Sequence, residues 1–506
     1  MVGKRKEFKK TCPSVVIETY VPNNNFYRRI KQLLNVDFLY QAVAPYYGKC
    51  GQKSVDPVVF FKLQLVAHFE NICSERALIE KSQLRLDILY FLDYTLGEPL
   101  PCHSTLSRTR KRLPTSVFET CFQAILSQCI EAGMVSGHTQ VVDAAFVEAN
   151  ASLDTFKRKA ILAWQLEKGE AKQIDHADIA GIKSPFTALE RTVKPIKKGR
   201  NNVTHQSLTD ADARINQKPG KPTRLYYLST MAVDSYRHVI THIQADLADE
   251  RDSKHLIEIA DKLSGKLKQY GLPLQYLLAD GGFGSGENYA FLEANKIKGF
   301  ISLPGSYHPL REGFNYDNQR DVYVCRNGKL LYNHGIRMEK GFANHYYHAQ
   351  IKECGVCPFK KECCGNKRRQ SLTFSVYRHY HQRMQERIES KEGVSMKRRR
   401  MATVEPVFGS LLNYYGMKRA NAKGKQAAHK FMLIAACAYN LQKLLFHIPD
   451  PKNKVQVLPT QQLLVLYFTF LCVVQHPRRF YVLLLPLFLL WSYQKAVKNY
   501  STSIAS

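Results

Sequence analysis

Two short apolar segments, far apart in the chain, each carry an aspartate beside small residues, and together they constrain the fold most strongly. They are Val141-Val142-Asp143-Ala144-Ala145-Phe146-Val147 and Leu277-Leu278-Ala279-Asp280-Gly281-Gly282-Phe283. Short apolar runs bounded by turn residues are typical of buried strands. In an α/β sheet, functional residues collect at the carboxyl ends of the strands. We therefore expect folding to bring Asp143 and Asp280 together.

The chain between and after these segments predicts the rest of a sheet with helical cover. A hairpin is expected around the turn Asp234-Ser235-Tyr236-Arg237, because strand-like runs flank it. The expected elements follow the order strand, strand, helix, strand, helix, strand, at residues 225–233, 238–243, 252–270, 274–279, 287–295 and 300–303. This alternation indicates an α/β fold.

The chain before the first aspartate is predicted to be helical and to end in a cationic helix. Apolar residues recur at helical spacing from Pro57, and a break at residues 97–101 precedes a basic segment at residues 103–113. That segment carries four basic side chains, Arg108, Arg110, Lys111 and Arg112. Short helices followed by a cationic helix are typical of a helix-turn-helix module, whose last helix enters the DNA major groove. We predict DNA contacts for these four side chains; the alternative is a solvated basic helix.

The charge of the chain favours a polyanionic partner. Lys and Arg total 73 against 43 for Asp and Glu, which gives a formal net charge of +30. Neutralising phosphates releases counterions and favours binding, whereas an enzyme of small metabolites has little need of this excess. We therefore predict a nucleic-acid partner, the alternative being a generally basic surface.

The cysteines indicate a reducing compartment and one local metal site. Their number, 13, is odd, and no apolar stretch follows the basic residues 1–10 as it would in a signal peptide. Two close pairs, Cys354 with Cys357 and Cys363 with Cys364, resemble a zinc knuckle. Cys325, His345 or His348 supplies a ligand if Cys364 points away. The alternative is a set of reduced structural thiols.

The C-terminal part, residues 449–506, contains two apolar runs that are too short to span a bilayer as helices. Residues 463–474 and 480–491 hold 12 residues each, against the ~20 that a spanning helix needs. We interpret this part as an extension of low functional importance, and membrane association as the less favoured alternative.

Three short motifs, each centred on an acidic residue, resemble those of a known family. Val142-Asp143, Leu278-Ala279-Asp280 and Val404-Glu405-Pro406-Val407-Phe408-Gly409 resemble those of bacterial insertion-sequence transposases of the DDE class, in particular the branch numbered eleven-eighty-two. Residues 103–113, Gly424 and residues 438–445 add to the resemblance, which covers roughly residues 10–447.

The resemblance implies a ribonuclease-H-like catalytic core and two Mg²⁺ or Mn²⁺ ions. It implies cutting of double-stranded DNA at the ends of a mobile element and joining of the freed 3′-hydroxyl to target DNA. Asp143 is then expected to bridge both metals, with Asp280 a ligand to one and Glu405 to the other, because hard cations prefer carboxylate oxygens. Glu405 precedes Pro406 and is expected in the first turn of a helix. No covalent protein intermediate is required.

The basic cluster of the family is expected at Lys418, Arg419 and Lys423, because Leu412 stands where a basic residue is common. Other acids, Asp210, Asp212, Asp234 and Asp249, lie in expected loops and are weaker site candidates. A homodimer on DNA is expected, since transposition holds two ends together. The expected location is the cytoplasm, in association with the nucleoid.

Five regions follow from these patterns. They are a helical DNA-binding domain at 1–135, the first part of the catalytic core at 136–304, an inserted β-rich domain with the cysteines at 305–400, the last part of the core at 401–448, and the apolar extension at 449–506. Two other functions remain open: a metal-dependent nuclease of the same fold that does not join DNA, and a non-catalytic, sequence-specific DNA-binding protein.

Overall fold

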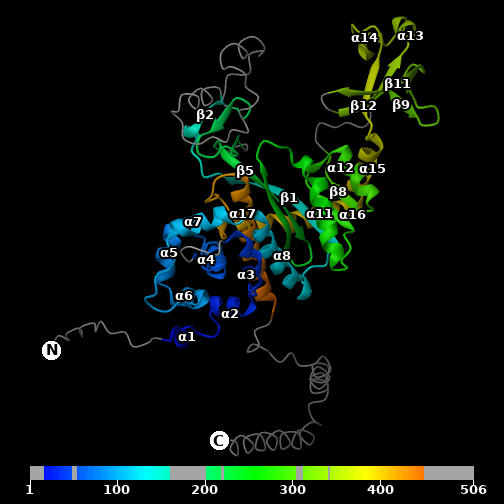
Figure 1. Cartoon of the computed structure of the whole chain (residues 1–506). Coiled ribbons are helices and arrows are strands. Elements are labelled where there is room, and N and C mark those ends of the chain that lie inside the picture. The colour runs from blue at the N-terminus through cyan, green and yellow to red at the C-terminus, as the bar shows by residue number, and fades with distance from the viewer. Residues whose placement is uncertain are drawn as a thin grey trace, which may run out of the picture. The chain divides into compact units, whose positions relative to one another are not determined.

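The strand that carries Asp143, β1 (Thr139–Glu148), lies inside a six-stranded sheet in the described part of the chain (Figure 1). The structure is a computed structural model that describes residues 16–47, 54–159, 201–217, 222–303, 312–339 and 342–448. The apolar extension expected at residues 449–506 lies outside this description. Val141 and Val142 are fully buried, in keeping with the apolar pattern that predicted the strand.

The other strands of this sheet follow the predicted order closely. They are β4 (Arg214–Asn216), β5 (Arg224–Asp234), β6 (Ile240–Leu247), β7 (Tyr276–Ala279) and β8 (Lys298–Ile301). The path is β4-β5-β1-β7-β8, and β6 pairs with β5. The strands β5 and β1 are antiparallel, as are β5 and β6, while β1, β7 and β8 are parallel. The carboxyl ends of β6, β1, β7 and β8 therefore point toward the same edge.

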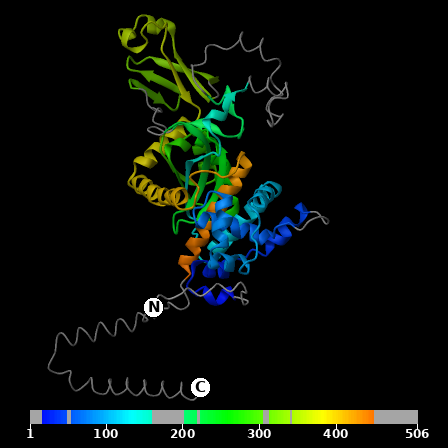
Figure 2. The same cartoon turned by 90° about the vertical axis from the view of Figure 1, so that its left-hand side faces the viewer.

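Helices cover this sheet, so the expected mixed α/β architecture is confirmed. The buried helix α17 (Lys425–His447) contacts β5 and β6, and α11 (Leu256–Gln269) also contacts β6. The long helix α16 (Lys391–Asn413) contacts β1, β5, β7 and β8. Figure 2 shows α17 in orange, and α15 (Arg378–Glu389) and α16 in yellow, beside the green strands.

The N-terminal part is helical, as expected, and it packs on the core through α17. Its longer helices are α2 (Phe26–Leu33), α4 (Pro57–Phe69), α5 (Glu75–Gln83), α7 (His103–Arg112) and α8 (Thr115–Glu131). Asp56 caps α4 by accepting a hydrogen bond from the backbone N–H of Val58 at 2.7 Å, next to Pro57 in the first turn. Both α4 and α8 contact α17.

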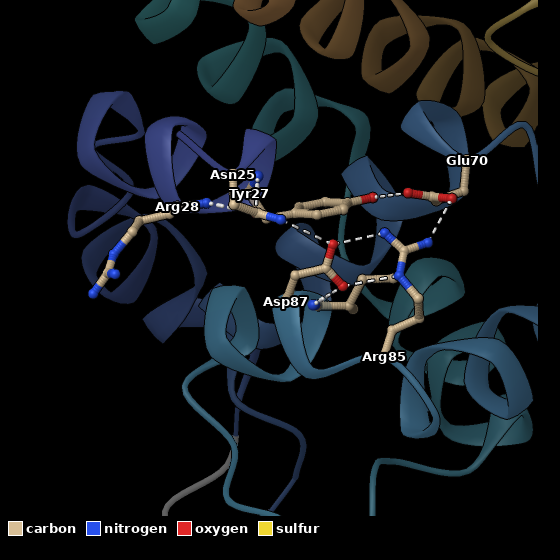
Figure 3. A network of polar contacts seen from close by, with 7 residues as sticks. Asn25, Tyr27, Arg28, Glu70, Arg85 and Asp87 are labelled. Atoms are coloured by element: carbon tan, nitrogen blue, oxygen red, sulfur yellow. Dashed lines mark hydrogen bonds and ion pairs between the residues drawn. The ribbon is translucent and has the colours of Figure 1, made fainter. Parts of the chain in front are cut away.

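A polar network links α2, α4 and α6 (Leu86–Leu92) in this helical part (Figure 3). The Tyr27 hydroxyl donates to Glu70 Oε1 at 2.6 Å, and Arg85 Nη1 donates to Glu70 Oε2 at 3.1 Å. Arg85 also donates hydrogen bonds to both carboxylate oxygens of Asp87, at 2.8 and 2.7 Å. Bidentate pairing of this kind fixes orientation, so the network sets how the three helices meet.

The inserted β-rich domain is a separate five-stranded antiparallel sheet in the described residues, with the order β13-β12-β11-β10-β9. Its strands are β9 (Phe314–Asp317), β10 (Val322–Cys325), β11 (Leu330–Glu339), β12 (Phe342–Ala349) and β13 (Ser371–Ser375). The helices α13 (Ile351–Gly355) and α14 (Lys360–Cys363) lie between β12 and β13 in the chain. Tyr323, Leu331, Tyr347 and Phe374 form a core of their own.

The structure corrects the start of the helix expected after this domain. The last described strand, β13, ends at Ser375, and α15 and α16 follow it. The helix expected from about Pro406 begins at Lys391, with Pro406 in its interior. A proline there removes one helical hydrogen bond. Burial of Val404, Val407 and the neighbouring apolar face offsets that loss, and this tertiary contribution is invisible in the local sequence.

Candidate metal and DNA site

Asp143 lies half-buried in β1 and faces α16. Its Oδ1 accepts a hydrogen bond from the backbone N–H of Ala144 at 2.8 Å. Its Oδ2 forms an ion pair with Arg400 Nη1 at 3.0 Å, and the two side chains are 18% and 17% exposed. The Asp143 carboxylate therefore lies at the surface of the sheet beneath α16, where it is paired with the guanidinium of Arg400.

Asp280 is the next residue after β7, beside Asp143. In the parallel register of β1 and β7, Val142 pairs with Ala279, so the two aspartates follow neighbouring paired residues. Asp280 Oδ1 accepts from the N–H of Gly282 at 2.9 Å and caps the short turn Gly281–Phe283. The structure thus brings these two sequence-predicted residues together at one edge of the sheet.

The charges around Asp143 are predominantly negative, despite Arg400. The pKa of the Asp143 carboxyl is raised to about 6, mainly by burial and in part by the nearby carboxylates of Asp280 and Asp252. The N–H of Ala144 and the guanidinium of Arg400 oppose this rise. Acids held together against their mutual repulsion are common at sites that bind cations or carry out catalysis.

Asp252 is a member of this cluster that sequence reasoning missed. It stands in the 3₁₀ turn η4 (Asp252–Lys254), before α11, and residues 252–270 were expected only as a helix. Its Oδ2 lies 2.7 Å from the place that a Cβ on Gly282 would occupy, and Asp280 Oδ1 lies 3.1 Å from the same place. The sequence signal that could have identified Asp252 was its position as an acidic residue shortly after β6, a strand that runs parallel to β1.

Glu405 is not brought into contact with these aspartates. It is exposed on α16, past the first turn where it was expected, and fourteen residues after Lys391 (405 − 391). At 3.6 residues per turn, the five residues from Arg400 place Glu405 about 140° around the helix from it. In the described ranges, no three His, Cys, Asp or Glu residues are arranged to hold a metal ion.

The basic helix α7 contains one correction. Arg110 is buried, with 7% of its surface exposed, and it forms an ion pair with Glu75. Burial lowers its pKa to about 10. Arg110 therefore serves the packing of α5 and α7 rather than a DNA surface, because its position on α7 shares the buried face with Leu106 and Thr109. Arg108, Lys111 and Arg112 are exposed.

The second basic cluster is exposed, and its segment is hydrogen-bonded to the end of β1. The backbone of Glu148, the last residue of β1, accepts from the N–H of Ala420 at 2.8 Å and donates to the carbonyl of Lys418 at 3.0 Å. Lys418, Arg419 and Lys423 are exposed. This bridge holds two of the three basic residues beside the end of the strand that carries Asp143.

The weaker acidic candidates have structural partners. Asp234 is fully buried and accepts from Gln140 Nε2 at 2.7 Å and from the N–H of Gly137 at 2.8 Å. Asp210 accepts from the Tyr227 hydroxyl at 2.5 Å and from the N–H of Gly424 at 3.1 Å. Asp212 accepts a hydrogen bond from the N–H of Lys425, and Asp249 forms an ion pair with Arg214.

The clustered cysteines lie together in the inserted domain as free thiols. Cys325 ends β10, Cys354 lies in α13, and Cys363 and the buried Cys364 lie at the end of α14. The pKa of Cys363 is raised by burial and by its neighbours Cys364, Cys354 and Cys325. The pKa of Cys354 is raised by burial and by Cys364 and Cys357.

The histidines considered as alternative ligands have other contacts. His345 Nδ1 lies 3.3 Å from Asn333 Nδ2, and His348 Nδ1 lies 2.8 Å from the Ser371 hydroxyl. Asn327 Nδ2 points at Cys357 Sγ, 3.5 Å away. Cys325 lies near Cys363, whereas both histidines contact other residues, so Cys325 is the better candidate for an additional ligand.

Two segments of the chain match families of transposase domains. Residues 15–112 match a transposase domain, DUF772, and residues 324–445 match a transposase DDE domain. The second segment includes Glu405, the clustered cysteines and the basic residues 418–423, whereas Asp143 and Asp280 lie outside both segments. Over these two segments the chain is similar to transposase domains, one of them a DDE domain.

Other comparisons add little to these matches. The chain is similar to a piggyBac transposase synaptic complex with hairpin DNA, at 10% identity over 85% of this chain and 84% of that chain, with a TM-score of 0.27. It is also similar to a Mos1 transposase paired-end complex with the left transposon end, at 11% identity over 52% and 63%, with a TM-score of 0.16. TM-scores this low do not establish a shared fold. No curated protein matches the chain.

Among the helices of the described part, none has the length and apolar composition that crossing a bilayer would require.

Proposed function

We propose that this chain is a DDE transposase of the branch numbered eleven-eighty-two. It cuts double-stranded DNA at the ends of an insertion element and joins the freed 3′-hydroxyl to target DNA by two-metal phosphoryl transfer. The observation that carries the proposal is the register of β1 and β7, which sets Asp143 beside Asp280 at the carboxyl edge of the sheet. The strand order, with antiparallel β6, β5 and β1 followed by parallel β7 and β8, supports a ribonuclease-H-like core.

The residues at this edge suit hard divalent cations. Asp143 and Asp280 offer carboxylate oxygens, which Mg²⁺ and Mn²⁺ prefer. Burial first, and then the neighbouring carboxylates, raise the pKa of Asp143, and a bound cation would favour its charged form. When bound, two such ions activate the attacking oxygen and stabilise charge on the leaving oxygen. Asp143 is proposed as the shared ligand and Asp280 as a ligand to one ion. Glu405 remains a proposed ligand from its motif, on the helix that already carries Arg400 to Asp143.

DNA binding is proposed to use the two exposed basic clusters. Arg108, Lys111 and Arg112 on α7 would contact one stretch of DNA, in a helix-turn-helix arrangement. Lys418, Arg419 and Lys423 would hold phosphates near the metal ions, because their segment is bonded to the end of β1. We further propose that the chain acts as a homodimer on two DNA ends in the cytoplasm, in association with the nucleoid.

The proposal is tested by incubating the purified chain with Mg²⁺, DNA that carries the ends of its own element, and a target plasmid. Cleavage at the element ends followed by strand-transfer products is expected. Cleavage without joined products would instead identify a nuclease of the same fold, and binding without cleavage would identify a non-catalytic DNA-binding protein.

Metal binding should depend on pH because Asp143 must lose its proton to act as a ligand. Its pKa is raised from 3.8 to about 6. The apparent affinity for the first Mn²⁺ ion should therefore increase by about tenfold per pH unit below pH 6 and level off above it, since Asp143 loses one proton when that ion binds. Calorimetric Mn²⁺ titrations between pH 5 and 8 measure this. A flat profile would contradict a role for Asp143 as ligand.

The Asp143 carboxyl also makes the stability of the metal-free chain depend on pH. This stability falls as the pH rises, whereas the metal affinity increases. Its folded-state pKa lies above the unfolded value, so the folded chain holds the proton more tightly between about pH 4 and pH 6. Its contribution to the free energy of unfolding is therefore largest at low pH and is lost as the pH rises through about 6.

We also propose that the inserted domain holds one structural zinc ion. Cys354, Cys357 and Cys363 would be ligands, with Cys364 or Cys325 as the fourth. Purified protein should contain about one zinc per chain, and removing it with a chelator should lower the unfolding temperature of the inserted domain, because zinc binding contributes to folding. Cys357→Ser should lose the zinc, while Cys102→Ser, an exposed cysteine elsewhere, should keep it. Zinc content in Cys364→Ser and Cys325→Ser identifies the fourth ligand; full retention in Cys357→Ser would refute the site.

A further inference from the structure

Asp252 reaches the candidate metal site from a part of the chain that no motif marks. It follows β6, which runs parallel to β1 and β7, so all three acids follow or occupy strands whose carboxyl ends meet at one edge. Asn288 fixes its turn in place, because the side-chain Nδ2 donates to the carbonyls of Ser253 and Phe283, each at 2.8 Å. The turn that carries Asp252 is thereby tied to the turn that Asp280 caps.

Gly282 allows Asp252 and Asp280 to approach each other. A Cβ at Gly282 would lie 2.7 Å from Asp252 Oδ2 and 3.1 Å from Asp280 Oδ1. The two carboxylate oxygens are therefore separated by no more than the sum of those distances. The first distance is shorter than van der Waals contact allows, so any larger residue at position 282 would push the Asp252 carboxylate away. Glycine is required here for close approach, not for its backbone angles.

The three acids also share an electrostatic environment. The charge of Asp252 raises the pKa of Asp143 in the same direction as the charge of Asp280. A divalent cation would relieve repulsion among Asp143, Asp252 and Asp280, and Glu405 has no comparable contact with them.

We propose that Asp252 supplies a third carboxylate to the divalent metal centre formed by Asp143 and Asp280. The inference rests on the proposed function and assigns this chain's own ligand set for that centre. Asp252 approaches from the Asp280 side, across Gly282, and so serves the ion that Asp280 binds. As they lie in the described structure, the three carboxylates are not arranged to hold an ion. Binding would require their side chains to rotate, which would replace the contacts of Asp143 and Asp280 with backbone N–H groups and of Asp143 with Arg400.

Binding of Mn²⁺ to the full chain without DNA tests the proposal, with electron paramagnetic resonance as the readout. Asp252→Asn should weaken Mn²⁺ binding by at least about tenfold, because losing even an outer-shell partner of a metal ligand commonly costs about 10- to 100-fold in affinity. Asp261→Asn, which removes the same charge from an exposed position on α11, should leave the affinity unchanged. Gly282→Ala should weaken binding as well, because the new methyl group displaces the Asp252 carboxylate.

The outcomes separate this inference from the proposed function. Wild-type affinity in Asp252→Asn, with loss of binding in Asp143→Asn, would overturn the role of Asp252 alone. Wild-type affinity in Asp143→Asn would overturn the metal centre itself. If Asp252→Asn fails to fold, wild-type protein loaded with Fe²⁺ and treated with ascorbate and peroxide decides the matter. Backbone cleavage near residues 143, 252 and 280 is expected, and absence of cleavage near 252 would refute the assignment.

Discussion

Asp143→Asn should reduce Mg²⁺-dependent cleavage of element-end DNA by at least about a thousandfold. The substitution keeps the size of the side chain but removes the charge that is proposed to bind both ions. Loss of metal stabilisation worth about 4 kcal/mol in the transition state corresponds to about three powers of ten in rate. The rate is measured under single-turnover conditions at saturating DNA, so that weaker DNA binding does not contribute.

Three comparisons make this result specific. Asp280→Asn should show a loss of similar size, and Asp261→Asn should cleave at the wild-type rate. Glu405→Gln tests the motif-based ligand, which the structure leaves exposed on α16. All variants should remain folded and should still bind element-end DNA, so that the loss of rate is a loss of cleavage. Cleavage by Asp143→Asn within tenfold of the wild type would remove Asp143 from the site.

Arg110→Met should destabilise the fold by about 3–5 kcal/mol, the usual result of removing one partner from a buried ion pair. Glu75 would keep its charge but lose its partner, among the apolar contacts of α5 and α7. Its side chain is 82% covered (100 − 18), so water could not fully replace Arg110. Denaturant unfolding followed by circular dichroism measures the change. The matched control is Lys111→Met on the same helix, which is exposed and should change stability by less than about 0.5 kcal/mol.

DNA binding by the same pair of variants separates packing from recognition. Lys111→Met should lower affinity and reduce the slope of log K against log salt by about one, because one phosphate contact is lost. Arg110→Met should lose affinity only in proportion to the unfolded fraction. A folded Arg110→Met protein with a reduced salt slope would restore Arg110 to the DNA surface.

The sheet was predictable because its strands have patterns that their own residues determine. The apolar runs that end at Asp143 and Asp280 became β1 and β7, and the hairpin around Asp234 formed as expected. These are local signals, and the pairing of β1 with β7 follows from the rules that govern α/β sheets.

The misplaced features all depend on contacts between distant segments. Arg110 looked like its basic neighbours in sequence, but Glu75 and the helices around it decide that it is buried. Pro406 suggested the start of a helix. The apolar face of α16 packs on the sheet, and this packing allows the helix to continue through Pro406. Asp252 had no motif, and only the two adjoining turns reveal its closeness to Asp280.

The ion pair between Arg400 and Asp143 has a thermodynamic consequence for a chain that works as proposed. A divalent ion arriving at Asp143 meets an oxygen that a guanidinium already neutralises, so loading is an exchange of cations. The released guanidinium gains most if a DNA phosphate is present to receive it, since arginine pairs well with phosphate. Metal and DNA would therefore each raise the affinity for the other by the same factor. The chain would therefore bind metal more weakly without DNA than with it.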